Sequence, residues 1–538
     1  MAAVHDWERQ AQVSRDILAQ SIPKQWLLPT DKLPSAERTN VLDVPRESGI
    51  LTEKELQITE TDATGLVETM ARGTWTAEEV LIAFLKRATI GHQLLNFATE
   101  FMVEDALSQA RDLDSHFRRT GEIVGPLHGV PISVKEMVSF RGRVTNTGYV
   151  SWTSSNAASQ DALMIRSLRK AGAVFHVRTN LPQTCMHLDC NNNITGRTHN
   201  PHNIRLSPGG SSGGESASIG FRCAAIGIGS DIGGSIRLPA AFCGCYGIRP
   251  TTLRTPWNGV GLAGEGQEGI RCTLGPLTNS LRDLDLFMKA VTDGRPWDEE
   301  TSLVPLPWKE RALTKDITIG ILWDDMIVHP HPPVQRAMNE AVAKLKMAGI
   351  LVKDWRPYKH AHGMRIINDL FYPDGAAAQL AALEASGEPW LPLTKEAFTR
   401  ARKMTVAETW TVNLERETYR TEYRSLMEEQ GVEYILCPAY LGVAAAPNEA
   451  RYSAYTAIWN ILDMPGVVFP SGLKVDPHLD GIETGYHPRS AQDELEYRAY
   501  APEKFTDAPI GLQLVGKRFC DEELVAASKV LESIIRSS

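Results

Sequence analysis

A repeated alternation of short apolar runs and helical stretches, which starts at Pro126, constrains the fold of this chain more than any other feature. Apolar runs such as "GVPISVKEMV", "AGAVFHVRTN", "CAAIGIGSD", "ITIGILWD" and "IGLQLVGKR" alternate with helix-like stretches such as "SQDALMIRSLRK" and "DEELVAASKVLESII". Runs of this kind are typical of strands that are buried on both faces. The sequence therefore predicts an α/β fold: a single large domain with a central mixed β-sheet covered by helices on both faces.

About the first 120 residues have a helical pattern instead. Thr76 and Glu79 fit a capping box at the start of "AEEVLIAFLKRA", whose apolar residues recur at helical spacing. We expect residues 1–60 to form an N-terminal helical extension ahead of one large domain over residues 61–538.

A proline-rich stretch, "GRPWDEETSLVPLPWKE" (294–310), is either a domain boundary or a loop across the surface. The alternation resumes after it, which favours one large sheet. Residues 356–430 are rich in Ala, Glu and Arg and have long helical stretches. We expect an inserted helical cap over a site within about residues 310–430.

Charge and cysteine content exclude several classes of protein. The net charge of −9 and the pI near 5.9 leave no basic excess to follow a phosphate backbone, so we expect no nucleic-acid partner. Eight scattered cysteines indicate reduced thiols rather than a disulfide framework. No stretch resembles a secretory signal, and none approaches the ~18 apolar residues of a membrane span. We therefore expect a cytoplasmic protein with no membrane span.

Glycine is concentrated in one part of the chain: eleven of the 42 glycines lie within 205–247. The segment "SPGGSSGGESASIGFRCAAIGIGSDIGGSIRLP" (207–239) could be a linker, a phosphate-binding loop or the floor of a catalytic site. A flexible linker would not contain the run "FRCAAIGIGSDI". A phosphate-binding loop ends in Gly-Lys-Ser/Thr, whereas Glu215 follows Gly213 and Gly214 here, and the spacing does not match the dinucleotide motif. The catalytic interpretation remains.

Ser235 is the candidate nucleophile of this segment. It follows the run "AAIGIG" and the turn "SDIGG", and "SIRLPAAF" can begin a helix. Free backbone N–H groups and the positive end of a helix would then converge at its hydroxyl. The N–H groups of Ile232, Gly233, Gly234 and Ser235 could stabilise a developing oxyanion.

The segment does not contain an obvious base for Ser235. It has no histidine, and Arg237 stands where a G-x-S-x-G elbow has its second glycine, whereas Ser212 fits that pattern but has no strand before it. A histidine brought in by folding is one candidate base. The other is Lys135, at the end of the apolar run "HGVPISVK", because burial disfavours a charged lysine. Otherwise its ammonium would lie in solvent or pair with Glu136.

Several thiols and one imidazole could suggest a zinc site. Cys185, His187 and Cys190 are close in sequence, as are Cys243 and Cys245. Their spacing gives neither paired C-x-x-C knuckles nor an H-E-x-x-H helix. We expect buried thiols, no metal and no cofactor.

Three separated blocks, "GVPISVKE", "SPGGSSGGESA" and "GSDIGGSIRLPAAFCGCYGIRPT", together resemble the amidase signature family, whose members hydrolyse amides with a serine-serine-lysine triad. Two further stretches, "RTNLPQTCMHLDCNNNITGRTHNP" and the late "YTAIWNILDMPGVVFP" followed by "APIGLQLVGKR", are similar to the branch with fungal acetamidase-like enzymes and, more distantly, vertebrate fatty acid amide hydrolase. The resemblance covers about residues 60–290 and 430–535. It implies that 61–538 is a catalytic domain with a signature core at about 126–290.

The resemblance also implies roles for individual residues. Lys135 resembles the base, Ser211 the bridging serine and Ser235 the nucleophile that forms the acyl-enzyme. A cis peptide bond is implied between Gly210 and Ser211. The remaining implied roles are an oxyanion hole built from the backbone of Ile232, Gly233, Gly234 and Ser235, a substrate contact at Cys185, and supporting polar residues at Asp231 and Arg237.

The predicted function is an amidohydrolase that cleaves a carboxylic amide to an acid plus ammonia or an amine through an acyl-serine intermediate. Two alternatives use the same scaffold: the amide-hydrolysing subunit of a tRNA-dependent glutamine amidotransferase, and a catalytically silent binding protein. The intact Lys135, Ser211 and Ser235 argue against the silent protein. The expected partner is a small-molecule amide, and the resemblance suggests a homodimer.

Overall fold

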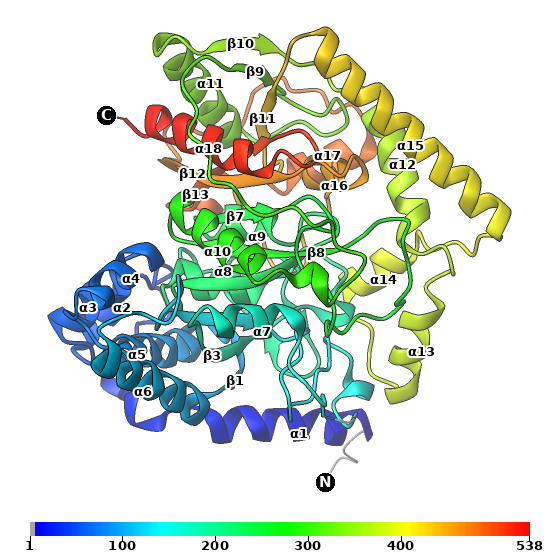
Figure 1. Cartoon of the computed structure of the whole chain (residues 1–538). Helices are drawn as coiled ribbons and strands as arrows, with labels where there is room; N and C mark the ends of the chain where they lie inside the picture. The colour runs from blue at the N-terminus through cyan, green and yellow to red at the C-terminus, as the bar shows by residue number, and fades with distance from the viewer. Residues whose placement is uncertain (1–5, 156, 538) are drawn as a thin grey trace.

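A mixed sheet of eleven strands passes through the molecule in the computed structural model, which describes residues 6–155 and 157–537 (Figure 1). The strand order is β1-β3-β2-β6-β8-β7-β12-β13-β11-β9-β10, so strands from the first half of the chain form one side of the sheet. The short strands β4 (Asn191–Asn192) and β5 (Gly196–Arg197) pair separately. The eleven strands are β1 (Ala98–Phe101), β2 (Pro131–Lys135), β3 (Val174–Thr179), β6 (Ile226–Asp231), β7 (Tyr246–Arg249), β8 (Thr273–Thr278), β9 (Thr318–Ile321), β10 (Leu351–Asp354), β11 (Tyr434–Pro438), β12 (Gly466–Lys474) and β13 (Pro509–Val515).

The apolar runs form strands because both faces of the sheet are covered. Every residue of β2, β3 and β6 is buried, whereas the edge strand β10 is mostly exposed. β2 is parallel to β3 and β6, and β6 is antiparallel to β8. The prediction of an α/β fold with a central mixed sheet is confirmed.

Residues 6–120 are mostly helical, as predicted, and the edge strand β1 of the sheet lies between α5 and α6. α5 begins at the expected capping box: the Glu79 N–H donates to Thr76 Oγ1 and the Thr76 N–H donates to the Glu79 carboxylate, both at 3.1 Å. Residues 1–5 of the expected extension lie outside the described residues, and its boundary at residue 60 stays a prediction. The helices here are α1 (Asp6–Ser21), α2 (Val44–Ser48), α3 (Glu53–Glu60), α4 (Ala63–Ala71), α5 (Ala77–Leu95) and α6 (Val103–Thr120).

Further helices cover both faces of the sheet (Figure 1). α8 and α9 form one contacting pair of helices: α8 packs on β2 and β6, and α9 packs on β7, β12 and β13. α10 and α18 form another pair: α10 packs on β7 and β8, and α18 packs on β12 and β13. The helices outside the N-terminal region and outside 356–430 are α7 (Leu163–Lys170), α8 (Gly213–Gly220), α9 (Arg237–Phe242), α10 (Leu281–Asp293), α11 (Pro332–Met347), α16 (Ala454–Ile461), α17 (Ala491–Arg498) and α18 (Asp521–Ile535).

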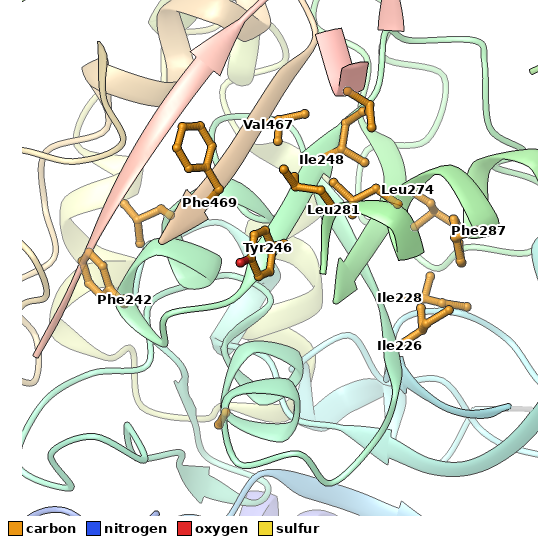
Figure 2. Close-up of a cluster of buried hydrophobic side chains, with 14 of the residues drawn as sticks. Ile226, Ile228, Phe242, Tyr246, Ile248, Leu274, Leu281, Phe287, Val467 and Phe469 are labelled. Carbon is orange, nitrogen blue, oxygen red and sulfur yellow. The ribbon is translucent and has the colours of Figure 1, made fainter. Parts of the chain in front are cut away.

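Side chains of the central strands and of the covering helices form a continuous core (Figure 2). Ile226 and Ile228 of β6, Ile248 of β7, Phe469 of β12 and Phe287 of α10 are completely buried within it. Because these residues come from distant parts of the sequence, the core fixes the strands in one register and holds the loops at their ends.

Residues 310–430 contain sheet as well as helices. β9 and β10 extend the sheet, α11 between them packs on it, and the next four helices lie at its side (Figure 1). No helix in the described part of the chain is both long and apolar enough to cross a bilayer. The four helices are α12 (His360–Phe371), α13 (Ala377–Ser386), α14 (Pro392–Phe398) and α15 (Val406–Glu429).

Candidate active site

Three chain segments meet at the edge of the sheet where β2 and β6 end. The two strands are parallel neighbours, with Val134 opposite Ile228, so their carboxyl ends lie side by side. Lys135 is the last residue of β2, and residues 232–236 form the turn from β6 to α9. The third segment is the loop 207–212 that leads into α8. These segments carry the three residues of the predicted triad.

Lys135 is completely buried, and hydroxyl groups surround its amine. Nζ lies 2.7 Å from Ser211 Oγ, 2.9 Å from Ser230 Oγ and 3.1 Å from Ser212 Oγ. Among the described residues, no carboxylate forms an ion pair with this amine. Glu136 instead accepts two backbone N–H groups of the following loop. The alternative of an ammonium in solvent or paired with Glu136 is therefore wrong.

Ser211 follows a cis peptide bond from Gly210, as the resemblance implied. A side chain at position 210 has no room, because a Cβ there would lie 2.3 Å from the backbone oxygen of Asp189. The Asp189 carboxylate also accepts the Ser207 hydroxyl at 2.6 Å. Cys185 Sγ lies 3.4 Å from Ser211 Oγ. The segment 185–189 thus packs on the loop that carries Ser211, and Asp189 holds the part of the loop just before it.

Ser235 lies in a turn that is held by a buried ion pair. The Arg237 guanidinium donates twice to the Asp231 carboxylate, at 3.1 Å each, and both side chains are completely buried. Burial alone would raise the pKa of Asp231, but the charge and hydrogen bonds of Arg237 lower it to about 2. The carboxylate accepts the N–H groups of Gly234 at 2.8 Å and Ile236 at 3.1 Å. Asp231 and Arg237 therefore support the backbone on both sides of Ser235.

The same contacts correct the predicted set of oxyanion donors. The Gly234 N–H donates to Asp231, so it is not free for a substrate. In the described hydrogen bonds, the N–H groups of Ile232, Gly233 and Ser235 have no protein acceptor. Three of the four predicted donors are thus available at this turn.

The two serines of the predicted triad lie on linked loops. The Ser212 N–H donates to the Ser235 carbonyl at 3.1 Å. No hydrogen bond joins Ser211 Oγ to Ser235 Oγ in the part of the chain that the structure describes. The structure therefore places Lys135 in contact with Ser211, and Ser235 on the adjoining loop without a direct contact to Ser211.

A cavity of about 100 Å³ opens at Ser235. Ile232, Gly233 and Cys185 line it together with Ser235 on the side of the sheet. The opposite wall comes from the region in which a cap was expected. Its residues include Asn368 and Phe371 of α12, and Leu393, Glu396 and Ala397 of α14.

The sequence analysis missed two hydroxyl groups next to Lys135. Ser230 is in β6, and its closeness to Lys135 depends on the register between β2 and β6, which no sequence spacing reveals. Ser212 lies in the loop ahead of α8, and no strand of the described chain leads into it. Its hydroxyl lies 3.1 Å from the Lys135 amine.

Glu215 is a further buried group that the sequence analysis used only to exclude phosphate binding. It lies in the first turn of α8, where its carboxyl group accepts Ser133 Oγ at 2.5 Å and Thr179 Oγ1 at 2.6 Å. Burial is the largest effect and raises its pKa to about 8. Glu215 therefore joins α8 to β2 and β3, the strands behind the site.

The candidate zinc ligands do not form a metal site in the structure. Cys185, Cys190, Cys243 and Cys245 are free buried thiols, as predicted. His187 Nε2 lies 3.3 Å from Thr394 Oγ1. Within residues 6–155 and 157–537, no group of three His, Cys, Asp or Glu side chains could hold a metal ion.

Comparisons with known proteins agree with one another. A family model described as "Amidase" matches residues 79–525. Acetamidases from Aspergillus oryzae and Emericella nidulans are each 39% identical to this chain over 98% of its length, and the alignments cover 99% and 98% of those proteins. A solved structure of a fatty acid amide hydrolase has a TM-score of 0.96 and 39% identity, covering 99% of this chain and 95% of its own. The similarity therefore extends through residues 310–430, which the sequence motifs left uncovered.

Proposed function

This chain belongs to the amidase signature family, whose enzymes hydrolyse amide C–N bonds, and we propose that it does so through an acyl-serine intermediate formed on Ser235. Lys135 is the base, and Ser211 carries protons between the amine and the nucleophile. One observation carries this proposal: a buried amine 2.7 Å from Ser211 Oγ, beside a cavity that opens at Ser235.

The proposed base must be neutral to accept a proton. Transferring a charged amine from water into a protein interior is costly unless an opposite charge compensates it. The Lys135 amine contacts three hydroxyl oxygens, and the described structure gives it no carboxylate partner. We therefore propose that Lys135 acts as the base through the Ser211 hydroxyl, its nearest contact at 2.7 Å.

The first half of the reaction forms the acyl-enzyme. Ser235 Oγ attacks the carbonyl carbon while its proton passes to Ser211 Oγ, and the proton of Ser211 passes to Lys135. The C–N bond then breaks as Ser211 returns a proton to the leaving nitrogen and regains one from Lys135. We expect the Ser211–Ser235 hydrogen bond to form when substrate binds, because catalytic hydrogen bonds are often long in empty sites.

The second half hydrolyses the acyl-enzyme by the same relay. A water molecule loses a proton through Ser211 to Lys135 and attacks the acyl carbon, and Ser235 regains its proton as the acid leaves. In both halves of the reaction, the oxyanion would accept hydrogen bonds from the free N–H groups of Ile232, Gly233 and Ser235. Loss of one such donor typically costs about 10²–10³-fold in turnover.

The cavity adds two roles. We propose that Cys185 contacts the bound substrate and that α12 and α14 form the cap over the substrate. The cap expected within about residues 310–430 would then lie within about residues 360–400. The named relatives act on amides of very different size, acetamide and fatty acid amides, yet each is 39% identical to this chain. Acetamide and longer primary amides are therefore the first substrates to assay.

The test uses the purified chain alone. Wild-type protein should release ammonia from simple amides without any partner, which a dedicated amidotransferase subunit would not do. Ser235→Ala should remain folded and lose hydrolysis by at least about 10⁴-fold, the scale of removing a nucleophile. Exposed Ser425→Ala is the control. Intact-mass spectrometry with a serine-directed fluorophosphonate should label wild type and Ser425→Ala but not Ser235→Ala, and full activity of Ser235→Ala would refute the mechanism.

A further inference from the structure

Two cavities lie next to each other at the turn that carries Ser235. The first chamber is the cavity of about 100 Å³ that Ser235 itself lines. The second chamber measures about 730 Å³ and is built mainly from the loop 253–272. Three residues line both chambers: Met186, Ile232 and Phe371. These three residues form the wall between them.

Phe371 is the bulkiest part of this wall. It is the last residue of α12, and it is only half-buried. A Cβ atom built on Gly233 would lie 3.2 Å from Phe371 Cζ, so the ring lies directly against the backbone turn beside Ser235. The ring also packs on the main core and on a smaller cluster around Tyr372 and Leu383. These contacts hold the ring in place between the two chambers.

The nucleophile has access to the smaller space only, because Ser235 lines the first chamber and not the second. The first chamber is much smaller than the second, at about 100 Å³ against about 730 Å³. A short amide such as acetamide needs only the space in front of Ser235. The chain of a longer amide would gain room by entering the second chamber, and Phe371 stands between the two.

We propose that Phe371 sets the upper size limit of the amide substrate by closing the first chamber against the second. This inference rests on the proposed function, since it assumes that Ser235 attacks an amide in the first chamber. With Phe371 in place, short amides are the substrates. Without its ring the two chambers join, and the space in front of Ser235 extends into the larger cavity.

The experiment compares chain-length profiles of wild type and Phe371→Ala. One series extends the acyl part from acetamide through hexanamide to decanamide, and another extends the amine part from acetamide to N-hexylacetamide. Wild type should prefer the short members of both series. Phe371→Ala should raise kcat/KM for the longer members relative to acetamide by about tenfold or more in at least one series, since apolar contacts of this size discriminate by that factor.

Three further variants keep the test independent of folding. Met186→Ala opens the same wall from another segment and should shift the profile in the same direction. Phe398→Leu is the control for Phe371→Leu: Phe398 lies in α14 and packs on Tyr372 and Trp390, but it is not among the described lining residues of either chamber. Phe371→Leu should shift the profile to a lesser extent than Phe371→Ala, and Phe398→Leu should not shift it.

The outcomes separate this inference from the proposed function. If wild type hydrolyses no amide of either series, the proposed function fails. If wild type hydrolyses amides and the folded Phe371→Ala and Met186→Ala variants keep the wild-type profile in both series, only the role of Phe371 is overturned. A wild type that already prefers decanamide would overturn it as well.

Discussion

At the scale of single residues, the environment of Lys135 sets its chemistry. Its position at the end of an apolar run makes it a candidate base. The run alone does not distinguish a buried amine from an ammonium that is exposed to solvent. The structure decides between the two, because it buries the amine and places three hydroxyl oxygens within 3.1 Å of Nζ. One of these hydroxyls, Ser230, comes from a strand 95 residues away.

Lys135→Ala should lower kcat on acetamide by about 10²–10⁴-fold, the usual contribution of a positioned base. KM should change little, because Lys135 is not among the described lining residues of the cavity. Initial rates over a range of substrate concentrations measure both constants. Lys170→Ala, at the exposed end of α7, is the control. A Lys135→Ala variant with wild-type kcat would remove the base from the mechanism.

At the scale of elements, a local sequence signal located the start of one helix correctly, and the hydrogen bonds of a turn shifted the start of another. The capping box at Thr76 starts α5 where predicted. The expected helix after β6 begins at Arg237 rather than at Ser235. The reason is Asp231, whose carboxylate accepts the Gly234 and Ile236 N–H groups and holds the residues between them as a turn.

The docking of α8 against β2 and β3 should depend on pH through Glu215. Its pKa is about 8 in the folded protein and near 4.5 in an unfolded chain. Between these values the folded protein binds more protons than the unfolded chain, so the free energy of unfolding falls as pH rises through this window. The slope for one group is at most about 1.4 kcal/mol per pH unit.

Glu215→Gln removes this titrating group and keeps its size. Urea unfolding midpoints between pH 5 and 8 should therefore fall less steeply with rising pH in Glu215→Gln than in wild type. Glu429→Gln, at an exposed position in α15, should keep the wild-type slope. Identical slopes for wild type and Glu215→Gln would show that Glu215 is already ionised in the folded protein across this range.

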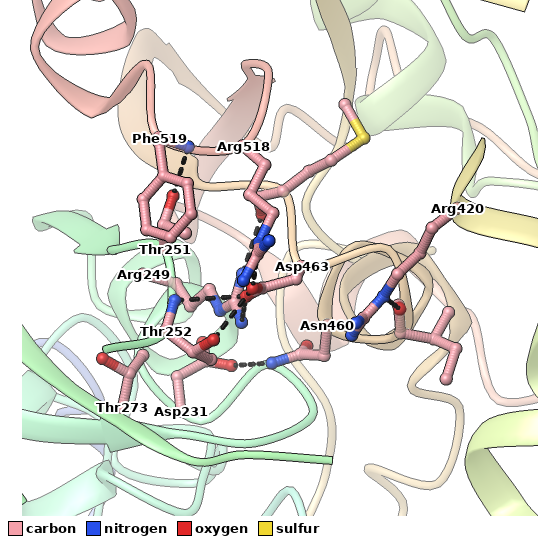
Figure 3. Close-up of polar contacts among 12 residues, drawn as sticks. Asp231, Arg249, Thr251, Thr252, Thr273, Arg420, Asn460, Asp463, Arg518 and Phe519 are labelled. Atoms are coloured by element: carbon pink, nitrogen blue, oxygen red, sulfur yellow. Dashed lines mark hydrogen bonds and ion pairs between the residues drawn. The ribbon is translucent and has the colours of Figure 1, made fainter. Parts of the chain in front are cut away.

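At the scale of the whole molecule, the C-terminal part of the chain completes a site whose proposed catalytic residues all precede residue 240. Asn460 Nδ2 donates to Asp231 at 2.8 Å, and Gln513 Oε1 accepts from Arg237 at 2.8 Å. A neighbouring network is centred on Asp463 (Figure 3). Its carboxylate accepts Arg249 Nη2 and Arg518 Nε at 2.7 Å each. These contacts join β7 to segments more than 200 residues later.

Asp463→Asn should destabilise the protein by about 3–5 kcal/mol, because it leaves the completely buried Arg249 without its charged partner. The free energy of unfolding from urea titration measures this loss. Asp293→Asn breaks an exposed ion pair with Lys289 and should cost less than about 1 kcal/mol. Equal stability of the two variants would mean that the Asp463 network does not hold the two parts of the chain together.

The sequence by itself determined the fold class, the glycine-rich turn and the three triad candidates. These features follow from local order along the chain: apolar runs of strand length, glycines where a turn needs them, and recognisable blocks around Lys135, Ser211 and Ser235. Each can be read over a few residues.

Only the tertiary structure decided which groups surround those residues. The register of β2 against β6 brings Ser230 to Lys135, Asn460 donates to the Asp231 carboxylate, and α12 places Phe371 against Gly233. These contacts join parts of the chain that are distant in sequence. They depend on packing across the whole core, which no short stretch of sequence encodes.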